Sequence, residues 1–330
     1  MALSRATQPS RVKSVTITIL SDQAGRGKSS VASSSNSLFL NCDGDRIATT
    51  AQAVDSIPIK KWQDALFSTD PEAMDLLKEK TTLVIDTIGG LVNLACFFIK
   101  KGEMLAIGES AQMTIRNWVP ATNLMMTYLH TCQLHEKDII MLGHSKVVNV
   151  EGANILIPVI AGAAIRNTIL QQSTAIGCLY WIKEGSEEYR ACQKLSFLGV
   201  DYKPYGHNGY VQVLDFCQSS IFTMGKNPGR YAPLLVPDLR KHSRWMEDMK
   251  EDMKEKINAE NELKASMRKE ALELVKSATT AKAYDKLLQD IGKHKQTDDV
   301  KFSVFLGEIM ASAKAKGIFY STEKKCFIGK

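Results

Sequence analysis

Residues 15–30 read Val-Thr-Ile-Thr-Ile-Leu-Ser-Asp-Gln-Ala-Gly-Arg-Gly-Lys-Ser-Ser, and this stretch decides the fold. Its first six residues are rich in β-branched side chains, which is typical of a strand. Two glycines, a lysine and two hydroxyls follow at the spacing of a loop that cradles phosphate groups. Such a loop turns its backbone N–H groups inward, and its lysine and first hydroxyl hold phosphate oxygens and Mg²⁺.

We expect the whole loop to line a bound nucleotide, through Asp22, Gln23, Ala24, Gly25, Arg26, Gly27, Lys28, Ser29 and Ser30. Gly27, Lys28 and Ser29 match the second half of the Walker A pattern. Asp22 stands where that pattern has its first glycine, so the match is incomplete. Taken alone, these residues also suit a basic, flexible turn, and the rest of the chain decides between the two interpretations.

A second strand supplies the deciding context. Residues 81–85 run apolar into Asp86, as expected for a parallel strand that is buried on both faces. Open α/β sheets bind ligands at the carboxyl ends of their strands, which is where Asp86 lies. The two strand–loop units together predict a P-loop domain that binds ATP, with Mg²⁺ held by Ser29 and Asp86.

Two further strands are expected to end beside the same site. Asp43 follows the strand at 37–42, and His144 follows the strand at 138–142. Nucleotide hydrolysis needs a group that orients water and a group that senses the γ-phosphate. We assign these roles to Asp43 and His144, and we assign charge neutralisation to Lys28. Asp43 is equally well explained as a turn residue, and His144 as a capped loop histidine.

Composition limits the class of protein. The chain has 330 residues, 44% hydrophobic and 24% charged, which suits one large domain with an appendage or two modest domains. The N-terminus lacks a secretory signal and no apolar run could cross a membrane, so we expect a cytoplasmic protein without a membrane partner. Seven dispersed cysteines predict reduced thiols and no structural zinc.

Strands alternate with helical stretches, which predicts an α/β fold with a mostly parallel central sheet and a helical C-terminal appendage. Residues 174–183 and 189–198 predict a late hairpin, and prolines within 228–237 mark a change in composition. We therefore divide the chain into a flexible lead (1–13), a P-loop ATPase domain (14–235) and a helical region (236–330). The last region ends in a basic tail with Lys314, Lys316, Lys324, Lys325 and Lys330.

The order of these motifs resembles the phage-encoded, RecA-like P-loop ATPases of the single-strand annealing and recombination group, which are reduced RecA/RadA cores. The resemblance covers about residues 15–220 and rests on 15–30, 39–44, 55–62, 84–91 and 141–146. It implies an ATPase of phage recombination that acts on single-stranded DNA in the host cytoplasm, forms a ring or filament, and meets a single-strand-binding protein. In this family the second strand ends in the catalytic carboxylate, usually a glutamate, and Asp43 takes that place here.

The resemblance also implies where the chain meets DNA and its neighbour. Residues 145–158 correspond to a mobile DNA-contacting loop, although Lys146 is its one cation. Cations of the late hairpin lie where RecA-like assemblies reach the neighbouring subunit's γ-phosphate. We choose Arg190, because a guanidinium binds phosphate in a bidentate way. A solvent-facing strand cation is the simpler alternative. In the same hairpin, Trp181 and Tyr180 would stack a base or fill the core.

Two other classes of function stay open. Asp22 and Asp43 also suit a degenerate site in a non-catalytic, nucleotide-gated scaffold or accessory protein. A P-loop motor or loader of the helicase class is the third candidate. ATP turnover with and without single-stranded DNA discriminates among them, since a scaffold binds without turnover and a motor unwinds duplexes.

Overall fold

The computed structural model describes residues 11–22, 25–43, 53–100, 113, 115–150, 153–195, 202–216, 225–295 and 298–329. They form two compact units. The larger is Lys13–Lys254, and the smaller is Glu255–Lys330 together with the N-terminal residues up to Val12. The boundary predicted between residues 235 and 236 rests on composition and stays a prediction.

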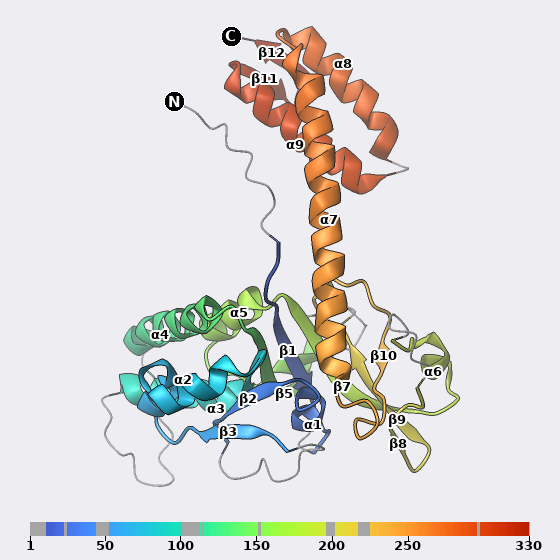
Figure 1. The fold of residues 1–330 in the computed structure, drawn as a ribbon. Coiled ribbons are helices and arrows are strands. Elements are labelled where there is room, and N and C mark those ends of the chain that lie inside the picture. The colour runs from blue at the N-terminus through green and yellow to red at the C-terminus, as the bar shows by residue number, and fades with distance from the viewer. Residues whose placement is uncertain are drawn as a thin grey trace. The chain divides into compact units, whose positions relative to one another are not determined.

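A central sheet organises the larger unit (Figure 1). Its strands lie in the order β10-β9-β7-β1-β5-β4-β2-β3, while β6 and β8 pair with β5 and β9. The strands from β7 to β3 run parallel, and β9 is antiparallel to both of its neighbours β7 and β10. Their bounds are β1 Thr16–Ser21, β2 Ser37–Asn41, β3 Asp55–Pro58, β4 Thr82–Asp86, β5 Asp138–Val150, β6 Ala153–Pro158, β7 Ala175–Lys183, β8 Gly206–His207, β9 Tyr210–Asp215 and β10 Leu234–Leu235.

The register of the parallel strands brings their carboxyl ends to one edge. Ser21 at the end of β1 lies opposite His144 of β5, and Asp86 at the end of β4 lies opposite Leu142. Strands β1, β2 and β4 are buried along their whole length, as expected for parallel strands covered on both faces. The predicted α/β fold with a mostly parallel central sheet and C-terminal helices is confirmed.

Helices α3, α4 and α5 cover one face of this sheet (Figure 1). They pack against alternate residues of β2, β4 and β5, such as Leu40, Ile85 and Met141, all of which are fully buried. No helix in the described part of the chain is long and apolar enough to cross a membrane. The helices of this unit are α1 Lys28–Ala32, η2 Trp62–Ala65, η3 Phe67–Thr69, α2 Pro71–Lys78, α3 Ile88–Ile99, α4 Ile115–Leu134, α5 Ala163–Gln172 and α6 Glu187–Ala191.

Two segments differ from the sequence predictions. Residues 145–158 were expected to form a mobile loop, but β5 continues beyond the sheet and pairs antiparallel with β6. The expected late hairpin is also wrong, because β7 pairs with β9 rather than with 189–195, the described part of the predicted second strand. Ser186 accepts a hydrogen bond from the Tyr189 amide and so caps α6, which starts a helix where a strand was predicted.

The smaller unit is built on helices, as predicted for this region. It contains the later part of α7 (Trp245–Lys276), α8 (Ala281–Gly292), η4 (Lys293–Lys295) and α9 (Asp299–Ala315). The basic tail is itself structured, because β11 (Ile318–Ser321) and β12 (Cys326–Gly329) form an antiparallel hairpin. Lys316 Nζ donates to the carbonyls of Val275 (3.3 Å) and Ala278 (2.6 Å), so this tail lysine caps the end of α7.

A buried ionic cluster fixes the start of α7 to the amino ends of the strands. Lys250 is completely buried, and its Nζ lies 3.1 Å from both Asp138 Oδ2 and Glu247 Oε2. It also donates to the Thr82 hydroxyl. Lys254 Nζ lies 3.0 Å from the same Asp138 oxygen. Asp138, Glu247 and Glu251 lie close enough together to hold a cation, and the two lysines fill this role.

Glu247 makes the stability of this cluster dependent on pH. Burial alone would raise the pKa of Glu247, but the Lys250 charge and the Ser35 hydroxyl outweigh burial and lower it. A lowered pKa in the folded state stabilises the protein above the ordinary glutamate value of 4.5. This contribution is lost as the pH falls through the lowered pKa.

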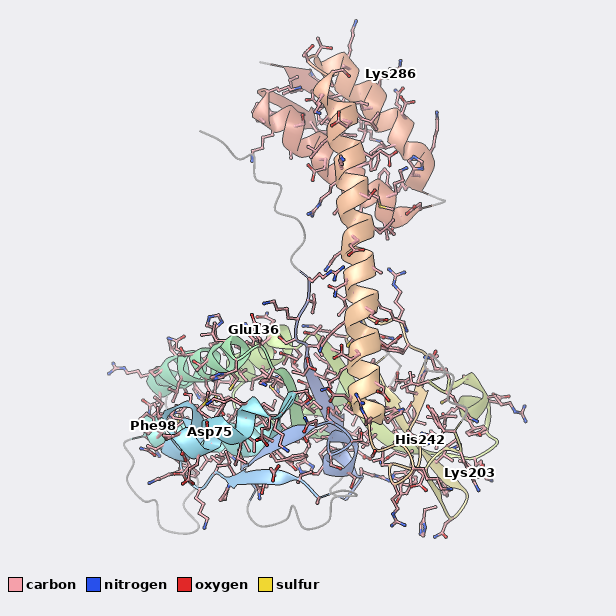
Figure 2. The ribbon with its side chains drawn as sticks, viewed as in Figure 1. Asp75, Phe98, Glu136, Lys203, His242 and Lys286 are labelled. Carbon is pink, nitrogen blue, oxygen red and sulfur yellow. The ribbon has the colours of Figure 1, made fainter. Side chains whose placement is uncertain are left out.

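Replacing Lys250 with Met should strongly destabilise the larger unit. The substitution leaves Asp138 and Glu247 buried with one positive partner fewer, and breaking a buried ion pair costs about 3–5 kcal/mol. The free energy of urea unfolding measures the effect. Lys78→Met is the matched control, because it breaks the exposed pair with Asp75 on α2 (Figure 2) and should cost less than about 1 kcal/mol. Equal effects of the two substitutions would show that the cluster does not anchor α7.

Candidate functional site

Two glycines in the described part of the loop after β1 have a backbone conformation that suits a phosphate-binding turn. Gly25 and Gly27 have φ angles of 76° and 84°, in the left-handed region that glycine adopts without strain. Gly27 caps α1, so Lys28 and Ser29 are the first two residues of the helix. The turn that precedes a helix start points backbone N–H groups at a common centre, which suits an anion.

Lys28 lies buried at the base of this loop. Its side chain is 6% exposed, and its Nζ donates to Ser21 Oγ over 2.8 Å. Burial lowers the pKa of Lys28, while the carboxylates of Asp86, Asp43 and Asp22 partly oppose the shift. A desolvated ammonium is stabilised by an anionic ligand, and this is the role that the sequence assigns to Lys28.

Ser29 connects the loop to the second predicted strand. Its hydroxyl donates to Asp86 Oδ2 over 2.6 Å, across the intervening strand β5. Asp86 is 8% exposed, and burial raises its pKa, with the Asp43 charge adding to the shift. The Ser29 hydrogen bond and Lys28 oppose it. A hydroxyl and a buried carboxylate are oxygen ligands that suit Mg²⁺, which retains most of its waters.

Asp43 is held beside this pair by Thr87. The Thr87 hydroxyl donates to Asp43 Oδ1 over 2.9 Å and accepts a hydrogen bond from the Gly90 amide over 3.2 Å, so Thr87 also caps α3. The close approach requires glycine at position 90. A Cβ there would lie 2.6 Å from Asp43 Oδ1 and 2.9 Å from the Cys42 carbonyl.

His144 completes the group from β5. It is half-buried, and burial lowers its pKa, to which the Lys28 charge contributes. The carboxylates of Asp43 and Asp86 act in the opposite direction. A neutral imidazole close to these charges can donate one hydrogen bond to a phosphate oxygen.

Asp22, which replaces the first loop glycine, is paired with Arg26. The Asp22 carboxylate lies 3.3 Å from Arg26 Nε. The carbonyl of Arg26 accepts a hydrogen bond from Gln212 of β9. A Cβ on Gly27 would come within 2.9 Å of the Gln212 amide nitrogen, so Gln212 braces the loop from the side opposite to Asp86.

The structure thus gathers Lys28, Ser29, Asp43, Asp86 and His144 at one edge of the sheet. Ser30 is half-buried in α1, and its carbonyl accepts a hydrogen bond from Ser33. Gln23 and Ala24 lie outside the described residues. Arg190 is exposed on α6 rather than on a strand, which corrects the strand setting assumed for it.

Sequence reasoning missed four residues of the site. Thr87 and Gly90 carry a readable signal, since a threonine directly after the strand-end aspartate is a helix-cap signature. Ser21 is the last residue of β1, and only the structure shows that its hydroxyl accepts a hydrogen bond from Lys28. Gln212 carries no local signal, because it lies far along the chain and reaches the loop through the β7–β9 pairing.

Comparisons with known proteins give fold-level likenesses of low score. No protein-family model matches the chain, and no curated protein matches it. The flagellar accessory protein FlaH of Methanocaldococcus jannaschii matches 52% of this chain and 73% of its own, at 12% identity and a TM-score of 0.30. A KaiC-like protein of Pyrococcus horikoshii OT3 matches 52% and 74%, at 10% identity and a TM-score of 0.31. These likenesses say nothing about the activity of this chain.

Gly90→Ala should destabilise the protein, whereas Gly307→Ala should stabilise it. Alanine in a helix is normally favoured over glycine by about 0.5–1 kcal/mol, and a Cβ at Gly307 meets open space. At Gly90 the Cβ would clash with Asp43 and Cys42, and such overpacking costs about 1–3 kcal/mol. Urea unfolding of both variants measures the difference. A stabilised Gly90→Ala variant would show that α3 does not approach Asp43 this closely.

Proposed function

We propose that this protein binds ATP with Mg²⁺ and hydrolyses it. The hydrogen bond of 2.6 Å between Ser29 and Asp86 carries this proposal, because it joins the loop hydroxyl to the strand-end carboxylate beside the buried Lys28. Few folds place these three groups together at the carboxyl edge of a parallel sheet, and P-loop ATPases use that combination for nucleotide binding.

Each charged group then has a defined task. Lys28 and the backbone of the loop would hold the phosphate oxygens, and Ser29 with Asp86 would hold Mg²⁺. When bound, the ion neutralises charge on the β- and γ-phosphates. Arg26 balances the charge of Asp22, so that the carboxylate does not act on the phosphates as an uncompensated anion.

Hydrolysis would depend on Asp43 and His144. Asp43 accepts the Thr87 hydrogen bond with one oxygen, which leaves its other oxygen to orient a water for attack on the γ-phosphate. His144 would donate to the γ-phosphate from β5. Arg190 is proposed to act on the nucleotide of a neighbouring subunit in a ring or filament.

We further propose single-stranded DNA in phage recombination as the setting of this ATPase, with a single-strand-binding protein as a partner. The observation that favours DNA is the exposure of several cations and one ring in the smaller unit. Lys314 on α9 and Lys324 and Lys325 in the turn between β11 and β12 are exposed, and Phe319 on β11 is 46% exposed. Lysines that neutralise phosphates and exposed rings that stack bases are the groups that bind single strands.

Lys28→Ala should abolish ATP hydrolysis and weaken ATP binding, because it removes the charge that neutralises the phosphates. Turnover by the wild-type chain should require Mg²⁺ and should rise when single-stranded DNA is added. Phosphate release measures turnover and its dependence on Mg²⁺ and DNA, and titration with ATP measures binding. Lys78→Ala is the control, since Lys78 is an exposed lysine on α2.

The outcomes separate the candidate functions. Unchanged turnover in Lys28→Ala would show that this loop is not the ATP site. ATP binding by the wild type without turnover would support the nucleotide-gated scaffold instead, and DNA-duplex unwinding would support the helicase-class motor. Turnover that does not respond to single-stranded DNA would remove that partner from the proposal.

Asp43→Asn should retain ATP binding and slow hydrolysis by about two orders of magnitude or more, a loss typical of a group that handles the proton of the attacking water. Asp43→Glu restores the residue usual in RecA-like sites and should retain more activity than Asp43→Asn. Single-turnover kinetics at saturating ATP measure the step. Two silent substitutions would mean that Asp43 is only a turn residue after β2, and the nucleotide-gated scaffold would then gain support.

A further inference from the structure

We propose that Trp181 and Tyr205 form the surface on which the base of the bound nucleotide stacks. The inference rests on the ATP binding proposed above and adds the side of the loop on which the base lies. The sequence left Trp181 open between base stacking and the core, and four features of the structure favour stacking.

The first feature is a row of three residues across neighbouring strands. Trp181 of β7 lies directly opposite Gln212 of β9, and the Gln212 amide donates to the Tyr205 carbonyl over 3.1 Å. Tyr205 lies in the segment just before β8, two residues after Lys203, which is labelled in Figure 2. Residues directly opposite in an antiparallel pair project to the same face, so Trp181 and Gln212 share one face of the sheet.

The second feature is the contact of this row with the P-loop. The side chain of Gln212 donates to the Arg26 carbonyl, and its Nε2 lies where a Cβ on Gly27 would come too close. The ring centroids of Trp181 and Tyr205 are 5.5 Å apart, so Tyr205 also lies on the face of Gln212. The two rings therefore flank the side chain that touches the loop.

The third feature is the direction that the metal ligands impose on the nucleotide. Ser29 and Asp86 lie toward β4, on the β5 side of β1, and the Mg²⁺ that they would hold supplies charge neutralisation at the γ-phosphate end of a nucleotide. The γ-phosphate end therefore faces β5 and β4. The nucleoside end has to leave in the opposite direction, toward β7 and β9, where Trp181 and Tyr205 lie.

The fourth feature is exposure. Tyr205 is 43% exposed and Trp181 is half-buried, so the pair presents aromatic surface to solvent. The pair of Trp62 and Tyr128 is different, because both of its rings are buried in the main core. An exposed aromatic surface beside a phosphate loop suits a planar base, which gains its stacking energy from any aromatic face.

The test compares ATP with inorganic tripolyphosphate, which has the phosphates and lacks the base. Calorimetric titration of the full chain in Mg²⁺ should show that Trp181→Ala and Tyr205→Ala each weaken ATP binding about 5- to 100-fold. Their affinity for tripolyphosphate should equal that of the wild type. Trp181→Phe should restore most of the ATP affinity, and Tyr189→Ala on α6 is the control that should change neither ligand.

Several results would overturn the proposal. Wild-type ATP affinity in both alanine variants would place the base elsewhere, while loss of ATP binding in Lys28→Ala would still support the proposed function. Equal losses for ATP and tripolyphosphate would show that the rings only position the P-loop. A wild-type chain that binds neither ligand would remove the ATP site itself, and the stacking surface with it.

Discussion

The hydrogen bond between Ser29 and Asp86 depends on the parallel sheet, because it joins the helix that follows β1 to the end of β4, and these two strands are not neighbours. Ser29 follows β1 and Asp86 ends β4, and β5 lies between them. A contact of 2.6 Å across an intervening strand requires all three strands to end at matching levels. The pairing register of β1, β5 and β4 places their ends at matching levels. If one strand shifted by one residue, each of its buried side chains would turn to the other face of the sheet.

The buried charged groups at the two edges of the sheet differ in whether the protein itself supplies their partners. At the amino edge, Lys250 is surrounded by Asp138, Glu247 and a threonine hydroxyl, so the protein itself satisfies the charge. At the carboxyl edge, burial lowers the pKa of Lys28 and raises the pKa of Asp86. Those two groups would gain from an anion and a cation respectively, which is the charge pattern of a nucleotide with Mg²⁺. The first edge stabilises the fold, and the second is suited to binding.

The loop between β1 and α1 is held from two sides. Asp86 holds it through Ser29 on the side of β4, and Gln212 holds it through the Arg26 carbonyl on the side of β9. Glycines at 25 and 27 permit the loop to turn tightly between these contacts. Because Gln212 lies in a row with Trp181 and Tyr205, a ligand that touches these rings would also act on the brace of the loop.

The sequence by itself determined the α/β fold and the glycine-rich turn that precedes α1, because apolar runs, glycines and strand-end acids act locally along the chain. It also placed Asp43, Asp86 and His144 at one edge, since parallel strands share the edge at which they end. Only the tertiary structure decided that Gln212 reaches the loop and that Thr87 holds Asp43. These contacts depend on pairings between residues far apart in the chain, which local patterns do not encode. The pairing of 145–150 with 153–158 and the helix that carries Arg190 form between near neighbours in the chain, and local patterns there suit more than one structure.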